Sequence, residues 1–501
     1  MSNARVHIVC YGCQMNRLDA GLVAEVLRES GAEVVADPAA ANVLLFLTCS
    51  VRAHAENRVF SNIGALAARK TREPGLLVGL LGCMAQQHGP DLMQRAPLVD
   101  FACAPGRLAE LPDLLARAER GERPVALDPT RAGDRAEGYP PWRAFGTADA
   151  ALDRLEVRAA ETGAGPGQAY VRAMRGCDNF CAYCVVPHVR GPERSRPPAA
   201  VLEEVRRAVE RGACQVTLLG QAVNKYRFEE EGRAWDLAAL LEAAAAVRGL
   251  SRLDFLTNHP RAMTARLVAV FRNLPPVCPY LHMPAQAGSD AVLRRMNRGY
   301  TAAEYLERVA MVRQAAPQVA VHSDFIVGFP GETEADFEAT LDLVRRMRPA
   351  GAFVFKYSPR PGTLAARDFA DDVPLKEKRR RNQALLDLVG RIAAEDNQAF
   401  VGREVEVLVE GSSPQARLRA ATGRSPWRTA GAERSPSASD LLPPASGLQL
   451  RGRTRCHRLV VFDGPPEDST GSGHALAGRE VRVRVEAAGA LTLFAALLPD
   501  K

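Results

Sequence analysis

The sequence predicts an α/β protein of three parts: an N-terminal parallel α/β sheet domain, a central partial (β/α)6 barrel and a C-terminal small antiparallel β-barrel. Three observations predict this fold class. Buried apolar runs alternate with helical segments in the first part, the same alternation repeats through the middle, and short alternating strands follow at the end. At 501 residues the chain is also too long for a single core.

The N-terminal domain is expected over residues 1–120. Strands are predicted at RVHIVC (5–10), VLLFLTC (43–49) and LLVGLLGC (76–83), each followed by a segment of helical composition. Parallel α/β sheets bind their ligands beyond the carboxyl ends of the strands. Three cysteines that are far apart in the sequence follow these strand ends and are expected to converge on one edge: Cys13, Cys49 and Cys83.

Residues 121–162 are predicted to be a linker with at most local structure, because Arg, Glu, Pro, Gly and Ala dominate them with weak periodicity. The central barrel is expected over residues 163–395. Its strands are predicted at 169–176, 214–223, 252–258, 279–286, 319–329 and 352–358. Barrels of this kind carry their chemistry at the carboxyl ends of the strands.

The last part, residues 398–497, is expected to form short strands at 404–411, 448–455, 457–464, 480–487 and 491–497. Such strands are typical of a small barrel of the oligonucleotide-binding (OB) type. Residues 412–447, rich in Ser, Pro, Ala and Arg, are expected to be a disordered insertion in this barrel.

Composition narrows the class of protein. No uninterrupted apolar stretch reaches about 18 residues, so no membrane span is expected. The first residues lack the pattern of a secretory signal, so a cytoplasmic location is expected. Eleven cysteines in such a chain favour metal binding or redox chemistry over structural disulfides. The net charge of +7 permits an anionic partner without requiring one.

The stretch CDNFCAYC places Cys177, Cys181 and Cys184 directly after a predicted strand. A structural zinc site takes four protein ligands, and the sequence nearby offers no plausible fourth. Three thiolates suit a [4Fe-4S] cluster that is bound at three corners and leaves one iron free to bind another molecule. Zinc or a reactive thiol group is the alternative for these cysteines.

With this motif on the first barrel loop, and with Tyr183 before the third cysteine, the chain resembles the radical S-adenosylmethionine superfamily. In that superfamily the free iron binds S-adenosylmethionine, and one electron from the cluster cleaves it to a 5′-deoxyadenosyl radical. LLGQAVNKY (218–226) and DFIVGFPGET (324–333) are expected to form a cradle for this cofactor. The candidate contacts in these two segments are Gln221, Asn224, Gly328 and Glu332.

Further motifs narrow the resemblance to the methylthiotransferase family. They are YGCQMN (11–16), LTCSVRAHAE (47–56), GCMAQ (82–86), CDNFCAYCVVPHVRGPERSR (177–196), HMPAQAGSDAVLRRMNRGYT (282–301), DFIVGFPGET and YSPRPGT (357–363). The C-terminal barrel resembles the family's TRAM domain, an RNA-binding module. Two positions depart from the family pattern, since Leu47 stands where Asn is usual and Ala222 interrupts the usual Gln-Asn-Val-Asn.

The resemblance implies that Cys13, Cys49 and Cys83 hold a second [4Fe-4S] cluster with an open iron. It also implies an enzyme that inserts a methylthio group at C2 of N6-isopentenyladenosine, at the adenosine 3′ of the anticodon in tRNA. One S-adenosylmethionine supplies the methyl group in this family and a second supplies the radical. Burial in an apolar core is the alternative for these three cysteines.

The expected partners are a tRNA that carries isopentenyladenosine and an electron donor of flavodoxin or ferredoxin type. The sulfur donor stays open, and a monomer is expected. Arg190, Arg194 and Arg196, just beyond the first cysteine loop, are candidates for tRNA phosphate contacts. The basic run KEKRRR (376–381) is better explained as a solvated helix face.

Two other functions stay open at this point. A sister methylthiotransferase would act on threonylcarbamoyl-adenosine in tRNA or on an aspartate of a ribosomal protein. The segments at 14–16, 50–52 and 358–360 favour the isopentenyladenosine branch by resemblance. A non-catalytic RNA-binding protein with structural zinc sites belongs to another class, and the two open three-cysteine sets argue against it.

Overall fold

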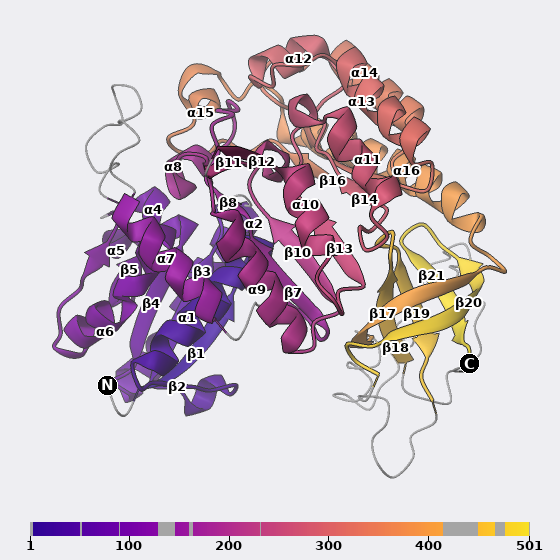
Figure 1. The fold of residues 1–501 in the computed structure, drawn as a ribbon. Coiled ribbons are helices and arrows are strands. Elements are labelled where there is room, and N and C mark those ends of the chain that lie inside the picture. Colours follow the sequence, from indigo (N-terminus) through magenta and orange to yellow (C-terminus); the bar gives the residue numbers. More distant parts are fainter. Residues whose placement is uncertain are drawn as a thin grey trace, which may run out of the picture.

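The computed structural model describes residues 4–50, 53–89, 91–128, 146–159, 164–230, 232–413, 449–465 and 476–499. They form three parts (Figure 1). The N-terminal domain, coloured indigo to purple, and the C-terminal barrel, coloured yellow, lie on either side of the central barrel. None of the helices in these ranges is both long and apolar enough to cross a membrane.

The N-terminal part is a six-stranded parallel sheet in the order β2-β1-β3-β4-β5-β6. Its strands are β1 (Arg5–Cys10), β2 (Glu33–Val34), β3 (Val43–Thr48), β4 (Leu77–Gly82), β5 (Phe101–Cys103) and β6 (Val125–Ala126). Its helices are α1 (Gln14–Glu29), α2 (Ala53–Gly64), α3 (Ala67–Arg72), α4 (Cys83–His88), α5 (Asp91–Arg95) and α6 (Leu111–Glu119). Strand β6 extends this sheet beyond the predicted boundary at residue 120.

Strand β3 shows why this sheet is parallel and covered on both sides. All of its residues are buried. Leu45 and Leu47 pack into an apolar cluster with α1 and α6, whereas Leu44 and Phe46 join another cluster with α2 and α4. A strand that is covered on both faces has a continuous apolar run in its sequence. This pattern is the one that predicted β3.

A helix, α7 (Gly146–Arg158), lies inside the segment predicted as a linker. Leu152 and Leu155 are buried against the N-terminal domain, and the buried carboxylate of Glu156 pairs with arginines of the central part. Part of the predicted linker therefore belongs to the folded structure. Residues 129–145 and 160–162 of that segment lie outside the described residues.

The central part is an open barrel of parallel strands, each followed by a helix, as predicted. The strands are β7 (Gln168–Arg172), β10 (Gln215–Leu219) and β13 (Arg252–Phe255) in one half, and β14 (Tyr280–His282), β15 (Ala320–Val327) and β16 (Gly351–Lys356) in the other. A parallel bridge between Leu253 and Val277 connects the halves.

The outer helices of this barrel are α9 (Pro198–Glu210), α10 (Leu237–Ala245), α11 (Ala265–Asn273), α13 (Ala302–Ala315), α14 (Glu334–Met347) and α16 (Leu375–Gln398). Its loops add the short helices α8 (Val186–Arg190), α12 (Asp290–Arg295) and α15 (Leu364–Asp368). They also add two antiparallel pairs, β8 (Met174–Arg175) with β9 (Arg194–Ser195) and β11 (Arg227–Glu230) with β12 (Arg233–Asp236).

The C-terminal part is a closed barrel in the order β17-β18-β19-β21-β20. Its strands are β17 (Glu404–Ser412), β18 (Gln449–Thr454), β19 (Leu459–Asp463), β20 (Glu480–Ala488) and β21 (Thr492–Leu497). The pairs are antiparallel as predicted, except that β19 and β21 run parallel. The predicted insertion starts at the last residue of β17, and residues 414–447 lie outside the described residues.

The C-terminal barrel docks at the amino-terminal ends of the central strands. Arg252, at the start of β13, is buried and its Nε lies 2.5 Å from Glu480 Oε1. His457 reaches further in, because its Nε2 lies 2.9 Å from Asp254 Oδ1 and its ring stacks on Tyr280 with centroids 4.0 Å apart. The carboxyl-terminal rim of the central barrel therefore faces away from this contact.

Candidate functional site

The cysteines of the CDNFCAYC loop lie beyond the carboxyl end of β7, between β8 and α8. Gly176 lets this loop begin, because its φ is +69° and a Cβ at this position would overlap the carbonyl oxygen of Pro192. Besides burial, the nearby Cys181 raises the pKa of the Cys177 thiol and of the Cys184 thiol, so the three side chains lie close together. The predicted set of three thiols is therefore brought together.

Side-chain N–H groups point at two of these sulfurs. Asn179 Nδ2 lies 3.2 Å from Cys177 Sγ, and Arg298 Nη1 lies 3.2 Å from Cys181 Sγ. Burial raises the pKa of Cys177 to about 11 and also raises the pKa of Cys184. Because iron binds thiolates, ligand binding at this loop releases their protons. Hydrogen bonds to the sulfurs are also one of the factors that tune an iron–sulfur cluster.

Arg298 is a site residue that the sequence did not single out. It follows α12, is buried, and also donates from Nε to Tyr300 Oη at 2.9 Å and from Nη2 to the carbonyl oxygen of Pro284 at 3.0 Å. In the sequence it is one of several arginines in a basic stretch. Its contact with Cys181 becomes visible only when the barrel brings residue 298 to the loop.

The second set of cysteines also converges, as predicted. Cys13 precedes α1, Cys49 follows β3 and Cys83 begins α4, so all three lie at the carboxyl edge of the parallel sheet. A Cβ on Gly12 would lie 2.6 Å from Cys49 Cβ, so the two loops touch. The pKa of Cys13 is lowered to about 6, first by a hydrogen bond with Cys49 and then by the charge of Arg190.

Helix α8 connects the two sets. It follows Cys184 closely in the chain, and Val185 and Val189 pack against Cys83 of the second set. Arg360, from the loop after β16, carries a charge that acts on Cys49 and lies 3.6 Å from the carboxylate of Glu56. Both cysteine sets are therefore held by the junction between the N-terminal domain and the central barrel.

The donor sets fit iron–sulfur clusters. Among the residues that the structure describes, no three His, Cys, Asp or Glu side chains lie close enough to hold a single metal ion. A [4Fe-4S] cluster has a different requirement, because each of its thiolates binds a different iron. Soft thiolate donors, a ligand count of three and neighbouring positive charge are present at both sets.

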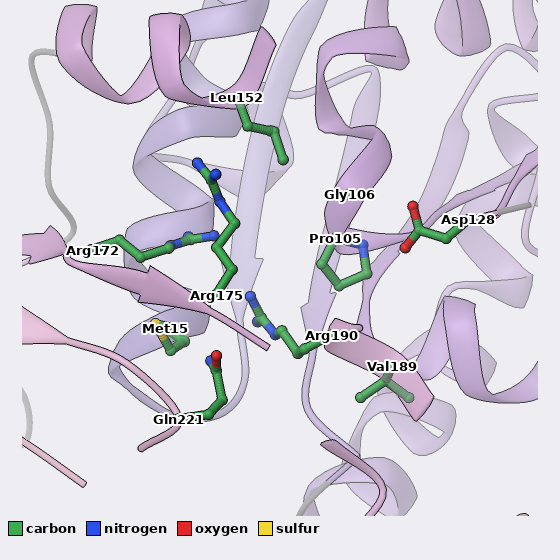
Figure 2. Close-up of a pocket in the computed structure, with 10 residues that line it drawn as sticks. All are labelled: Met15, Pro105, Gly106, Asp128, Leu152, Arg172, Arg175, Val189, Arg190 and Gln221. Carbon is green, nitrogen blue, oxygen red and sulfur yellow. The ribbon is translucent and has the colours of Figure 1, made fainter. Parts of the chain in front are cut away.

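Two of the predicted cofactor contacts lie after β10. Asn224 donates from Nδ2 to the carbonyl oxygen of His259 at 2.9 Å and accepts from its N–H at 2.8 Å, so its amide ties two strand ends together. Gln221 lines a small cavity of about 30 Å³ between the N-terminal domain and the barrel, with Met15 and Arg190 (Figure 2). Cofactor binding by Gln221 and Asn224 stays a prediction.

The other two predicted contacts, Gly328 and Glu332, shape the loop after β15. Gly328 has a φ of +68° and donates its N–H to the Glu332 carboxylate. Glu332 is buried, and its Oε2 lies 2.9 Å from Nη1 of Arg381 on α16. The structure thus gives these residues a role in fixing the loop against α16, and their contact with a cofactor stays a prediction.

The prediction of tRNA contacts is wrong for two of the three arginines. The Arg196 side chain is 1% exposed and its Nη1 lies 2.8 Å from Glu204 Oε2. The Arg190 side chain is 6% exposed and its Nη2 lies 2.7 Å from Asp19 Oδ2. A guanidinium that is buried in such a pair is not available to a phosphate. Arg194, on β9, is half-buried, and its role stays a prediction.

Comparison with family models matches residues 171–344 to the Radical SAM superfamily and residues 5–104 to Uncharacterized protein family UPF0004. The tRNA-2-methylthio-N(6)-dimethylallyladenosine synthase of Rhodopirellula baltica is 42% identical over 97% of this chain and 97% of its own length. The protein of the same name from Moorella thermoacetica is 40% identical over 95% of each chain.

Among solved structures, the fold is similar to that of the radical S-adenosylmethionine methyltransferase TsrM from Kitasatospora setae, determined with tryptophan and aza-SAM bound. The TM-score is 0.51 at 15% sequence identity, and the match covers 73% of this chain and 75% of that one. At this identity the likeness shows the fold alone.

Proposed function

Because the chain belongs to the family of tRNA-2-methylthio-N(6)-dimethylallyladenosine synthases, we propose that it attaches a methylthio group to C2 of N6-isopentenyladenosine in tRNA. The observation that supports this most is the pair of open three-cysteine sets joined by α8. The cluster ligands are Cys177, Cys181 and Cys184 in the central barrel, and Cys13, Cys49 and Cys83 in the N-terminal domain.

When bound, S-adenosylmethionine and the two [4Fe-4S] clusters supply the radical, the methyl group and a site for the incoming sulfur. The chain positions these groups and limits the access of water. Asn179 and Arg298 hold the sulfurs of the first loop through N–H donors. At the other end of the central barrel, His457 packs on Tyr280 and contacts Asp254, so the reacting groups are expected to be reached from the rim.

The tRNA brings its target base to this rim. A base that is stacked in an RNA loop must swing out to enter an enclosed site. The C-terminal barrel has the architecture of modules that bind oligonucleotides. On β20 it carries Arg482 and Arg484, whose side chains are 38% and 57% exposed, and such groups suit phosphate oxygens.

The remaining partners follow from the chemistry. Cleavage of S-adenosylmethionine consumes a low-potential electron, so a protein of flavodoxin or ferredoxin type is the proposed donor. A cytoplasmic location and a monomeric state are part of the proposal, and light scattering measures the oligomeric state directly.

Mass spectrometry of tRNA nucleosides tests the proposed function. Cells that lack this protein are expected to accumulate N6-isopentenyladenosine without its 2-methylthio derivative, and the wild-type gene restores the derivative. Cys181→Ala and Cys49→Ala are expected to restore none, whereas Cys103→Ala, a buried cysteine outside both sets, restores it.

Full restoration by Cys181→Ala would overturn the proposal. If the nucleoside that loses its methylthio group is threonylcarbamoyl-adenosine, the sister activity is the correct one. The two outcomes are separated by mass in the same digest.

A further inference from the structure

A buried group of opposite charges lies between the N-terminal domain and the central barrel. Its members are Arg172, Arg175, Arg190 and Arg196, which pair with Asp19, Asp153, Glu156 and Glu204. Figure 2 shows the first three of these arginines around the cavity at this junction. Each of the four arginines pairs with at least one of these carboxylates.

Arg190 is the member of this group that reaches the second cysteine set. Its Nη2 donates to Asp19 Oδ2 at 2.7 Å and to Asn16 Oδ1 at 3.2 Å. The same oxygen of Asn16 lies 3.6 Å from Cys13 Sγ. The guanidinium is therefore separated from this sulfur by a single amide group.

The end of α8 brings the same charge close to another sulfur of the set. Val189, the residue before Arg190, packs against Cys83. Burial raises the pKa of Cys83, and the charge of Arg190 acts in the opposite direction through a hydrogen bond and through space. The charge of one buried arginine therefore acts on two of the three sulfurs.

Asp19 is the counter-charge of Arg190. It is buried on α1, and its carboxylate also accepts from Arg172 Nη2 at 2.5 Å. Burial raises its pKa, but the charges of Arg190 and Arg172 outweigh this effect and lower the pKa below its usual value. The carboxylate is therefore ionised, and it opposes the effect of Arg190 on its surroundings.

From this geometry we propose that Arg190 is a positioning residue that raises the reduction potential of the cluster at Cys13, Cys49 and Cys83, and that Asp19 moderates this effect. Reduction adds one electron to a cluster that its thiolates already make anionic. A fixed positive charge that is itself buried, like that of Arg190, stabilises the reduced form. The external one-electron donor supplies this electron, and no bond forms or breaks. The proposal rests on the proposed function, because it requires a cluster at these cysteines.

An EPR-monitored redox titration of the holoenzyme, with dithionite and mediators, tests the proposal. Arg190→Gln is expected to make the midpoint potential of the second cluster more negative, and Asp19→Asn is expected to make it more positive. Arg190→Lys keeps the charge and is expected to stay nearer to the wild type than Arg190→Gln. The signal of the second cluster is the one retained in Cys181→Ala.

Arg175→Gln is the matched control. It removes another arginine of the same cavity, one that pairs with Asp153 and Glu156 of α7, and is expected to leave the potential unchanged. Shifts of opposite sign in Arg190→Gln and Asp19→Asn distinguish an effect of charge from a general loss of packing.

An unchanged potential in both Arg190→Gln and Asp19→Asn, or the same shift in Arg175→Gln, would contradict the proposal. If Arg190→Gln does not retain its cluster, the sign of the shift in Asp19→Asn decides. A wild-type protein that lacks the second cluster signal contradicts the proposed function instead, so the two failures are separate.

Discussion

Gly176 shows how one backbone position determines whether the first cysteine loop can form. Its φ of +69° disfavours residues with a side chain, and a Cβ would overlap Pro192. We expect Gly176→Ala to lose the cluster of this loop, so that the iron content falls from about eight to about four per chain. The loss of stability should exceed the ~1–2 kcal/mol that a left-handed alanine costs by itself. Iron analysis and thermal denaturation measure both effects.

Gly212→Ala is the control for this prediction. Gly212 also has a positive φ, of +93°, but a Cβ there meets no atom within 4 Å. This variant should lose only the stability that an alanine with a positive φ costs, and it should keep its full iron content. A Gly176→Ala protein with unchanged iron would show that the loop tolerates a different conformation.

At the residue scale, the sequence predicted the cysteines better than the arginines. Cysteines after the ends of parallel strands meet at one edge whatever the details of packing, so Cys13 and Cys49 could be placed together. The charge of an arginine does not indicate which group it will pair with in the folded protein. Arg190 and Arg196 find theirs on α1 and α9, and the fold that brings these helices close cannot be read from the local sequence.

At the scale of elements, α7 connects two domains, and its most deeply buried carboxylate belongs to Glu156. The Glu156 side chain is fully buried, and its oxygens lie 3.1 Å from Arg172 Nε, 2.6 Å from Arg175 Nη2 and 3.1 Å from Arg196 Nε. Replacing it leaves buried arginines with less counter-charge. We expect Glu156→Gln to lower the free energy of unfolding by about 3 kcal/mol, as measured by chemical denaturation.

Glu203→Gln is the comparison for Glu156→Gln. Glu203 lies on α9 and pairs with Arg207 at 2.9 Å, but both side chains are 41% exposed. Water screens such a pair, so its loss should lower the free energy of unfolding much less than the loss of Glu156 does. Equal effects of the two substitutions would mean that the buried group does not connect the domains.

Elements with a strong apolar pattern could be predicted, and elements that depend on their neighbours could not. Strands β3, β4 and β15 carry enough apolar residues to show their pattern, whereas β2 and β6 consist of two residues each and exist because a neighbouring strand pairs with them. The sequence of helix α7 shows only weak periodicity. Contacts with other elements hold this helix in place, so it could not be predicted from its own sequence. The parallel pairing of β19 with β21 arises when the barrel closes. The alternation of apolar and polar residues along a strand does not specify which way its neighbour runs.

At the scale of the molecule, the contact between Asp254 and His457 joins the C-terminal barrel to the core. Burial raises the pKa of Asp254, but the charge and hydrogen bond of His457 outweigh this effect and lower it below its usual value. A carboxylate with a depressed pKa stabilises the fold above its unfolded pKa, and this contribution is lost as the pH falls through the folded value.

We therefore expect Asp254→Asn to loosen the C-terminal barrel at neutral pH. Hydrogen exchange in residues 455–457 should accelerate. The difference in unfolding free energy from the wild type should begin to shrink as the pH falls below about 4, the usual pKa of an Asp carboxyl, and should be lost once the pH has passed the lower pKa of the folded carboxyl. Denaturation at a series of pH values measures this difference.

Asp324→Asn separates this effect from a general change in the barrel. Asp324 pairs with His282 at 3.0 Å, and His282 also belongs to the central barrel. This variant should leave exchange in residues 455–457 unchanged. Faster exchange there in Asp324→Asn would mean that the docking contact is not specific to Asp254 and His457.

The central claim is that each three-cysteine set holds a [4Fe-4S] cluster. Iron and acid-labile sulfide analysis of anaerobically prepared full-length protein, together with Mössbauer spectroscopy, tests it most directly. We expect about eight irons and about eight sulfides per chain, all in clusters of the [4Fe-4S] type. About four irons or fewer, or zinc in place of iron, would contradict it.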